Sequence, residues 1–401
     1  MSDYVEVAAG IGRRICEQAF WHDGRCNWVG ALPDENAYGQ TIINYAALGP
    51  DLYGGTSGVG LFLAQLHAVT GDPAARSAAL GALRHARAHA ADPGQPSGPG
   101  LYAGRVGIAL AHARAGALLG DEEAVTGAGA LLVDLAPDAE FDLMTGNAGT
   151  IVGLLALARL LGSDDLLASA HDFGRRLLAD AQADDAGVSW QAPAQPHRRN
   201  LTGLSHGAAG AAIALLELWN ASGEPAYRDG AQAALAYESA LYDPAAGNWP
   251  DLRNDDGTSF ATFWCHGAPG IALGRLRAAE LLGDDVCRAD AQLALATTQR
   301  AVAAELGSGA GNFSLCHGLA GNAEVLLEAA RHGADEDGRR DELVRAVADA
   351  GIERHVRHAV PWPCGTFEGE TTSLFLGLAG IGLFYLRLDD PAVDSVLLVE
   401  P

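Results

Sequence analysis

Residues 263–270 read Phe263-Trp264-Cys265-His266-Gly267-Ala268-Pro269-Gly270. The same Cys-His-Gly-x-x-Gly pattern returns at Cys316, 51 residues further along the chain. A third copy begins at Ser205, where serine replaces the cysteine before His206. Thiols and imidazoles that recur in one register predict a transition-metal site assembled from distant segments. The alternative is that buried cysteines and capping histidines stand at helix starts by chance, and two copies in register disfavour it.

The glycine pair of this pattern occurs seven times. Gly-x-x-Gly begins at Gly55, Gly104, Gly146, Gly207, Gly267, Gly318 and Gly377. Each pair opens an apolar stretch that is predicted to be helical, for example 150–161, 211–219 and 271–282. Most stretches end at a Gly-Asp, Gly-Ser or Gly-Glu-Pro turn, and a more polar helix is predicted beyond it; the Asp or Ser of the turn, such as Asp72 or Ser163, is expected to cap that helix. These second helices include 74–91, 166–181, 227–241 and 286–306.

This alternation predicts how the helices pack. Helices that are apolar on most faces must be covered on most sides, which an inner ring achieves when amphipathic helices surround it. We therefore expect an all-α fold, an α/α toroid of seven inner and seven outer helices, as a single domain over 1–401. The first 50 residues should supply an outer helix that closes the ring, and no β-rich segment stands out. An open helical array is the alternative, but repeat spacings of 42 to 61 residues are too irregular for one. The irregularity lies mainly in the returns, the segments that lead from an outer helix back to the next inner one; those at 193–200, 245–257 and 361–372 are rich in Pro, Gly and Asp and are expected to line one rim.

Composition excludes several classes of function. The net charge of −24 argues against nucleic acid, whose phosphates need a basic face, and against an anionic membrane surface. All 26 basic residues are arginine, so lysine Schiff-base chemistry and the phosphate-binding P-loop are excluded. The sequence shows no signal peptide and no membrane-spanning run, and its six cysteines are too few for a disulfide framework. We expect a protein of the reducing cytoplasm.

The repeat register also predicts where the chemistry lies. If every inner helix starts at its glycine pair, all seven N-termini face one end of the toroid. The residues just before these glycines then meet at that rim. Cys265, Cys316 and His317 form a two-sulfur, one-nitrogen set that suits zinc. Three protein ligands leave a fourth position open, which is the catalytic pattern, so we expect one Zn²⁺ per chain.

At this point the chain resembles a known family. Segments 203–207, 264–267 and 314–318 are similar to the signatures of lanthionine synthetase cyclases. The resemblance extends to 52–55, 142–146, 377–382 and 395–401, and the last of these is similar to the end of the cyclase half of class II bifunctional lanthipeptide synthetases. It therefore covers nearly the whole chain.

The resemblance implies a zinc-dependent toroid that joins a cysteine thiol to a dehydrated serine or threonine of a precursor peptide, forming a thioether. The dehydratase half of the class II enzymes has no counterpart in these 401 residues. The chain would thus be a stand-alone cyclase served by a separate dehydratase, or an excised domain. The determinants for binding a leader peptide would be missing with that half.

The family match also implies roles for individual residues. His206 matches the catalytic histidine and is the candidate acid, and Asp142 matches the aspartate that orients or charges it. Spacing alone would make Asp142 a plain helix cap. His266 could donate a proton to the enolate formed in the addition, hydrogen-bond a ligand or cap its helix, and we expect the cap first. From the residues themselves, Cys287 is expected to lie in the core and Cys364 to be a bystander.

Other functions compete with this interpretation. A protein prenyltransferase subunit also activates a peptide thiol with zinc, but it needs an aromatic-lined pocket, and aromatic residues make up only 6% of this chain. A toroidal glycosidase needs two carboxylates, of which the register supplies only Asp142. A non-catalytic peptide-binding scaffold that retained zinc would carry the same residues as a cyclase.

Overall fold

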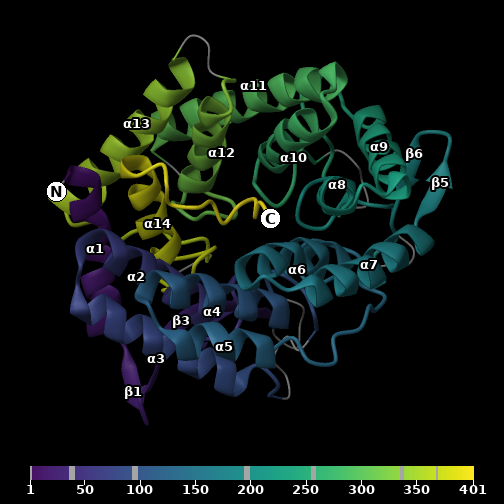
Figure 1. Cartoon of the computed structure of the whole chain (residues 1–401). Helices are drawn as coiled ribbons and strands as arrows, with labels where there is room; N and C mark the ends of the chain where they lie inside the picture. The colour runs from purple at the N-terminus through teal and green to yellow at the C-terminus, as the bar shows by residue number, and fades with distance from the viewer. Residues whose placement is uncertain are drawn as a thin grey trace.

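The structure is a computed structural model. It describes residues 2–35, 41–92, 98–193, 199–253, 259–309, 311–334, 338–366 and 369–401. Within these ranges fourteen α-helices form two concentric rings, which Figure 1 shows along the axis of the toroid. The all-α toroid expected from the repeat is therefore confirmed.

The inner ring contains the seven apolar helices. They are α2 (Thr56–Thr70), α4 (Arg105–Leu119), α6 (Asn147–Leu161), α8 (Ala208–Ser222), α10 (Ala268–Leu282), α12 (Leu319–Arg331) and α14 (Leu378–Asp389). Each packs against the next, and α14 packs against α2, so the ring is closed. Among the described helices, none combines the length and apolar character that crossing a bilayer requires.

The outer ring covers the inner one. Its helices are α1 (Asp3–Glu17), α3 (Pro73–His89), α5 (Glu122–Ala130), α7 (Asp164–Ala179), α9 (Pro225–Ala240), α11 (Asp285–Ser308) and α13 (Arg339–Gly351), the last followed by a π-helical turn, η1 (Ile352–Arg357). Six of them pack on the inner helix that precedes them. The exception is α1, which packs on α14, so the start of the chain closes the toroid as expected.

The glycine pairs fix where the inner helices begin. The first glycine of every pair is the N-cap, so the helices start about one turn earlier than the apolar stretches suggested. The second glycine lies against the carbonyl oxygen six residues before it. A Cβ there would stand between 1.6 and 2.2 Å from that oxygen in all seven copies. Only glycine fits such an approach, so the pair lets the preceding segment wrap over the first helical turn.

The turns between inner and outer helices follow their sequence signals. Gly71, after α2, takes a left-handed conformation at φ +72°, which favours glycine. Asp72 then accepts a hydrogen bond from the amide of Ala74, and Pro73 occupies the first helical position of α3. Ser163 was expected to act in the same way before α7, but its side chain makes no capping bond there.

Short strands accompany the helices, although no β-rich segment stands out in the sequence. Three two-stranded antiparallel hairpins lie in the described returns. They are β1 (Phe20–His22) with β2 (Arg25–Asn27), β3 (Val29–Glu35) with β4 (Thr41–Ala47), and β5 (Gln182–Asp184) with β6 (Gly187–Ser189). Asp23 and Gly24, both at positive φ, form the turn between β1 and β2. An Asp-Gly dipeptide is typical of a hairpin turn, but a search for helix periodicity does not detect it.

A ring of backbone hydrogen bonds joins the segments that precede the inner helices. We call these segments the rim loops: residues 49–55, 98–104, 140–146, 201–207, 261–267, 312–318 and 371–377. Amide-to-carbonyl bonds cross six of the seven junctions between neighbouring loops: Tyr53 to Tyr102, Tyr102 and Ala103 to Met144, Leu143 to Ser205, Ser205 to Cys265, Cys316 to Phe375, and Phe375 to Tyr53.

One junction in this ring differs from the others. No backbone hydrogen bond of the described residues joins the Cys265 loop to the Cys316 loop. Side chains meet there instead: the two cysteines hydrogen-bond to each other, and Asn322 donates from Nδ2 to the carbonyl of Thr262, 3.0 Å away. We call this junction the thiol seam.

Candidate functional site

The thiol seam brings together two of the predicted metal ligands. Cys316 is buried and Cys265 is half-buried. The hydrogen bond from the Cys316 thiol lowers the pKa of Cys265, and the positive charge of Arg253 lowers it further against the effect of burial. The same bond, together with burial, raises the pKa of Cys316. The pair therefore favours one thiolate stabilised by one thiol.

The third predicted ligand, His317, is held from the other side. Its Nε2 lies 2.9 Å from the carbonyl oxygen of Gly365. A Cβ on Gly365 would stand 2.9 Å from the same nitrogen, so only glycine leaves room for the ring. Metal-binding histidines commonly donate one ring N–H to a carbonyl, which leaves the other nitrogen for the metal.

The donor types therefore suit zinc: two thiols, one of them with a lowered pKa, and one imidazole oriented by a carbonyl. The structure does not gather all three. In the part of the chain that it describes, no three His, Cys, Asp or Glu side chains are grouped so that they could hold a metal ion. Cys265 and Cys316 meet, whereas the ring of His317 is bonded towards Gly365.

His206 and Asp142 form the second part of the site. Nδ1 of His206 lies 2.5 Å from Oδ2 of Asp142. The other oxygen, Oδ1, accepts hydrogen bonds from the amides of Thr145 and Gly146 at 2.8 and 3.1 Å. The N-cap of α6 is Gly146, so the Asp142 carboxylate is not the helix cap that spacing suggested; it orders the loop before the helix and contacts the histidine.

Each member of this pair changes the pKa of the other. Burial lowers the pKa of His206, but the hydrogen bond and charge of Asp142 outweigh it, so the pKa is raised. Burial raises the pKa of Asp142, but hydrogen bonds from His206 and Thr145 outweigh it, so that pKa is lowered. The pair is therefore an imidazolium and a carboxylate up to a higher pH than a free histidine would allow.

Asp142→Asn is expected to move the pH dependence of activity. The substitution removes the charge that raises the pKa of His206. The other titratable groups around His206 stay in place; they are Arg253, Cys265, Glu140 and His266. A histidine acid is active below its pKa, so the alkaline fall in kcat/KM should move to lower pH. Near neutral pH the loss should be on the order of 10²-fold. A pH–rate profile measures both effects, and an unchanged alkaline limb would remove Asp142 from this role.

Sequence reasoning missed Arg253 and Tyr53. Arg253 pairs with Asp251 through two bonds, of 2.9 and 2.6 Å, and its positive charge lowers the pKa of both seam cysteines. It lies in a return without a repeat signal. The hydroxyl of Tyr53 hydrogen-bonds to Cys316. The register could have found Tyr53, because it precedes its first glycine by two residues, as both seam cysteines do.

The expectation that His266 caps α10 is wrong. The N-cap is Gly267, and the first amide of the helix, that of Ala268, donates to Oδ1 of Asn248 at 3.0 Å. The His266 ring is buried and stacks on that of His206, with 5.7 Å between centroids. Burial, with the charges of Arg253 and His206, lowers the pKa of His266 to about 3, so its imidazole is neutral.

The two cysteines set aside in the sequence take part in other contacts. Cys287 is buried in α11 and its sulfur lies 3.6 Å from Oδ2 of Asp284. Cys364 is buried and its sulfur lies 3.7 Å from the carbonyl oxygen of Thr371. Cys364 also lines a cavity, although it does not contact the seam thiols in any described interaction.

That cavity opens beside the predicted metal ligand. It has a volume of about 870 Å³, and its walls include Tyr53, His317, Trp362, Cys364, Glu370 and Leu376. The described parts of the 361–372 return form much of its lining, as expected for a segment at this rim; residues 367–368 lie outside the described residues. The returns at 193–200 and 245–257 also fall partly outside them, at 194–198 and from 254 onward.

Solved structures of other proteins share this fold. Nisin cyclase aligns with a TM-score of 0.65 at 18% identity, over 86% of this chain and 89% of that chain. A sugar epimerase from a ruminal bacterium aligns at 0.50 and 13% identity, over 98% and 100%. A variant of an α-1,6-mannanase of Salegentibacter sp. HEL1_6 aligns at 0.52 and 14%, over 96% and 99%. At such identities these likenesses show the toroid alone.

The family comparison is more specific than the fold. The family described as lanthionine synthetase C-like protein matches residues 46–399, which include every rim loop, the thiol seam, His206 and Asp142. A match over most of the chain shows membership, and the residues that carried the resemblance lie inside it. The chain belongs to the lanthionine synthetase C-like protein family.

Proposed function

We propose that the protein is a zinc-dependent lanthipeptide cyclase. It would add the thiol of a peptide cysteine to dehydroalanine or dehydrobutyrine in the same dehydrated precursor, forming a lanthionine or methyllanthionine ring. One observation carries the proposal: in a chain of this family, a hydrogen-bonded His206–Asp142 pair and the paired thiols of Cys265 and Cys316 lie at the same end of the toroid. The acid and the thiol-binding residues that the reaction needs are thus near each other.

Cys265, Cys316 and His317 would hold one zinc ion per chain. When bound, zinc would lower the pKa of the substrate thiol, which is ~8.5 for a free cysteine and so mostly protonated at neutral pH. The thiol seam supports this assignment. Only there do neighbouring described rim loops lack a backbone bond, and shared coordination by two cysteines would join them.

The residues of the chain would then complete the addition. As the substrate sulfur bonds to the β-carbon, the π electrons of the alkene move to the α-carbon and its carbonyl, forming an enolate. His206 has its Nδ1 on Asp142, so the proton that reaches the α-carbon would come from its Nε2. Asp142 would keep the ring oriented and charged until that transfer.

The cavity beside His317 would receive the peptide around the reacting cysteine. Tyr53, Trp362 and Leu376 offer it apolar surface, while the carboxylate of Glu370 is paired with Arg14 of α1. A largely apolar wall suits a substrate bound through side chains near its cysteine more than through charge.

The geometry does not favour a glycosidase, despite the shared fold. A glycosidase acid is a carboxyl group whose pKa is raised. Burial and the charge of Asp142 raise the pKa of Glu140 in the same rim loop, but a glycosidase needs a second carboxylate free to act on the substrate. Asp142 and Asp251 are instead paired with His206 and Arg253, and the pKa of each is lowered after the effect of burial is overcome. A non-catalytic peptide-binding scaffold remains the second candidate, because the same residues would hold zinc without turnover.

Turnover separates these two candidates. The substrate is a synthetic peptide with one dehydroalanine and one cysteine, incubated near neutral pH with zinc-loaded protein. Cyclisation leaves the mass unchanged, so thiol loss is followed by alkylation and mass spectrometry. We expect ring formation well above a no-enzyme control, and its loss after chelation. Binding of the peptide without acceleration would identify the scaffold.

A further inference from the structure

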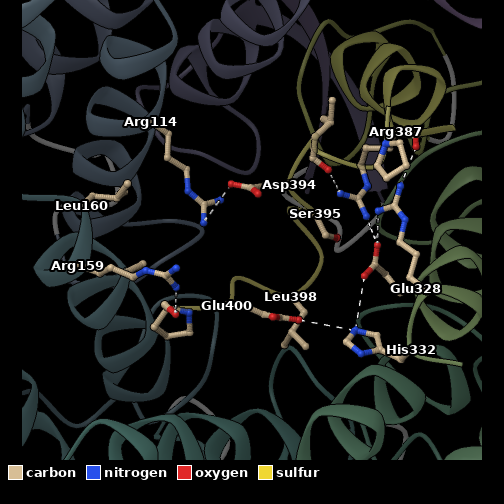
Figure 2. Close-up of a pocket in the computed structure, with 15 residues that line it drawn as sticks. Arg114, Arg159, Leu160, Glu328, His332, Arg387, Asp394, Ser395, Leu398 and Glu400 are labelled. Carbon is tan, nitrogen blue, oxygen red and sulfur yellow. Dashed lines mark hydrogen bonds and ion pairs between the residues drawn. The ribbon is translucent and has the colours of Figure 1, made fainter. Parts of the chain in front are cut away.

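The last residues of the chain enter the middle of the toroid. We call residues 390–401 the closing segment; Figure 1 places its end near the centre of the ring. Figure 2 shows it among side chains from the C-terminal halves of the inner helices. Its partners come from five inner helices: Arg114 pairs with Asp394, Arg159 with the carbonyl of Pro401, Arg277 with Glu400, Glu324 with Ser395, and Arg387 with the carbonyl of Val393.

The closing segment also reaches towards the opposite end of the ring. Its residues Val396 and Leu397 are buried. The hydroxyl of Tyr102 donates to the carbonyl of Val396 at 2.9 Å, and Nε1 of Trp264 donates to the carbonyl of Leu397 at 2.8 Å. Both donors belong to rim loops, so the closing segment contacts the same set of loops that contains Asp142, His206, Cys265 and Cys316.

Trp264 is the exception in its register. The residue three places before the first glycine is leucine in the other six rim loops: Leu52, Leu101, Leu143, Leu204, Leu315 and Leu374. Trp264 is fully buried, and its ring packs against those of Tyr102 and Phe375, with centroids 5.3 and 4.9 Å away. The next residue is Cys265. The one loop with an indole donor is therefore the one that presents the thiol of lowered pKa.

This loop also lacks a backbone hydrogen bond to one of its two neighbours among the described rim loops. The Cys265 loop accepts a backbone bond from Ser205 but has none to the Cys316 loop across the thiol seam. A side chain that must meet another at hydrogen-bond distance loses its geometry if its loop shifts by a fraction of an ångström. The bond from Trp264 to the closing segment restrains the Cys265 loop from inside the toroid.

We propose that the closing segment is a positioning element for Cys265, acting through the hydrogen bond between the Leu397 carbonyl and the Trp264 indole. It holds the Cys265 loop so that its sulfur meets that of Cys316. The consequence for zinc rests on the proposed function, whereas the effect on the loop itself does not.

The test compares two tryptophans that make the same bond. Trp264→Phe removes the donor and keeps a ring. Trp28→Phe is the matched control, because Trp28 is equally buried and donates from Nε1 to the carbonyl of Ile15 at 2.8 Å, in the outer part of the toroid. Leu397→Ala is a second variant that loosens the closing segment and leaves the Cys265 loop unaltered. Hydrogen exchange of residues 262–267 is measured in chelator-treated protein, and zinc affinity by competition with a chromogenic chelator.

We expect Trp264→Phe and Leu397→Ala to speed exchange at 262–267 by about tenfold and to weaken zinc binding by about 10- to 100-fold, the usual effect of losing a group that orients a metal ligand. Cobalt-substituted protein should show an altered ligand-field spectrum in the same two variants. Trp28→Phe should lower Tm and change neither readout. Wild-type exchange and zinc affinity in both variants would overturn the positioning role. If the wild-type protein takes up no zinc, the proposed function fails, while the exchange data still decide the role of the closing segment.

Discussion

Cys265→Ala and Cys316→Ala are each expected to abolish zinc binding and cyclisation. Wild-type protein should carry about one zinc per chain by elemental analysis, as expected of a site with three protein ligands. Either substitution leaves two of the three proposed ligands, and it also removes half of the hydrogen bond that closes the thiol seam. Exchange at the seam should therefore increase together with the loss of metal.

Cys287→Ala is the matched control for these variants. Cys287 is a buried cysteine of α11 that contacts Asp284 and no seam residue in the described interactions. It should keep its zinc and its activity with at most a modest fall in Tm. Circular dichroism of all three variants distinguishes loss of metal from loss of the helical fold. Full zinc content in both seam variants would show that the site lies elsewhere.

His206→Ala is expected to retain zinc and fold but to lose cyclisation by roughly 10²–10⁴-fold, the usual contribution of a positioned acid or base. The motif copy that contains His206 has Ser205 in place of cysteine, so no thiol of its own loop accompanies it. Its Nδ1 is bonded to Asp142 at 2.5 Å, and the hydrogen bond and charge of Asp142 raise its pKa above that of a free histidine. Removing it should therefore affect proton transfer and not metal binding.

Comparison with His171→Ala tests whether the effect is specific. His171 lies on outer helix α7, where its Nδ1 contacts the hydroxyl of Tyr227, and its loss should leave turnover unchanged. Loss of zinc from His206→Ala would make His206 a ligand and reverse the assignment of roles. A wild-type cyclisation rate would place the acid elsewhere. His266 would be examined next, although a pKa of about 3 makes it a poor proton donor at neutral pH.

The repeat pattern alone determined the architecture. Seven glycine pairs predicted seven inner helices, and each first glycine is an N-cap in the structure. This success has a local cause: a helix start, its capping residue and its apolar face are properties of neighbouring residues. A single register then places all seven starts at one end, so Cys265, Cys316 and His206 could be assigned to a common rim. The β1–β2 and β5–β6 hairpins were missed because strands of three residues leave too short a pattern to compete with helix periodicity.

Only the tertiary structure decided how these side chains are held. The carbonyl of Gly365 contacts His317, Arg253 faces the seam cysteines, and Leu397 accepts the indole proton of Trp264. His317 and Gly365 are 48 residues apart in the sequence, and Trp264 and Leu397 are 133 residues apart. In both of these contacts the acceptor is a backbone carbonyl. A carbonyl is present in every residue, so no side-chain pattern marks the one that will accept. Its position follows from closing the ring, which brings together segments whose local sequences carry no sign of one another.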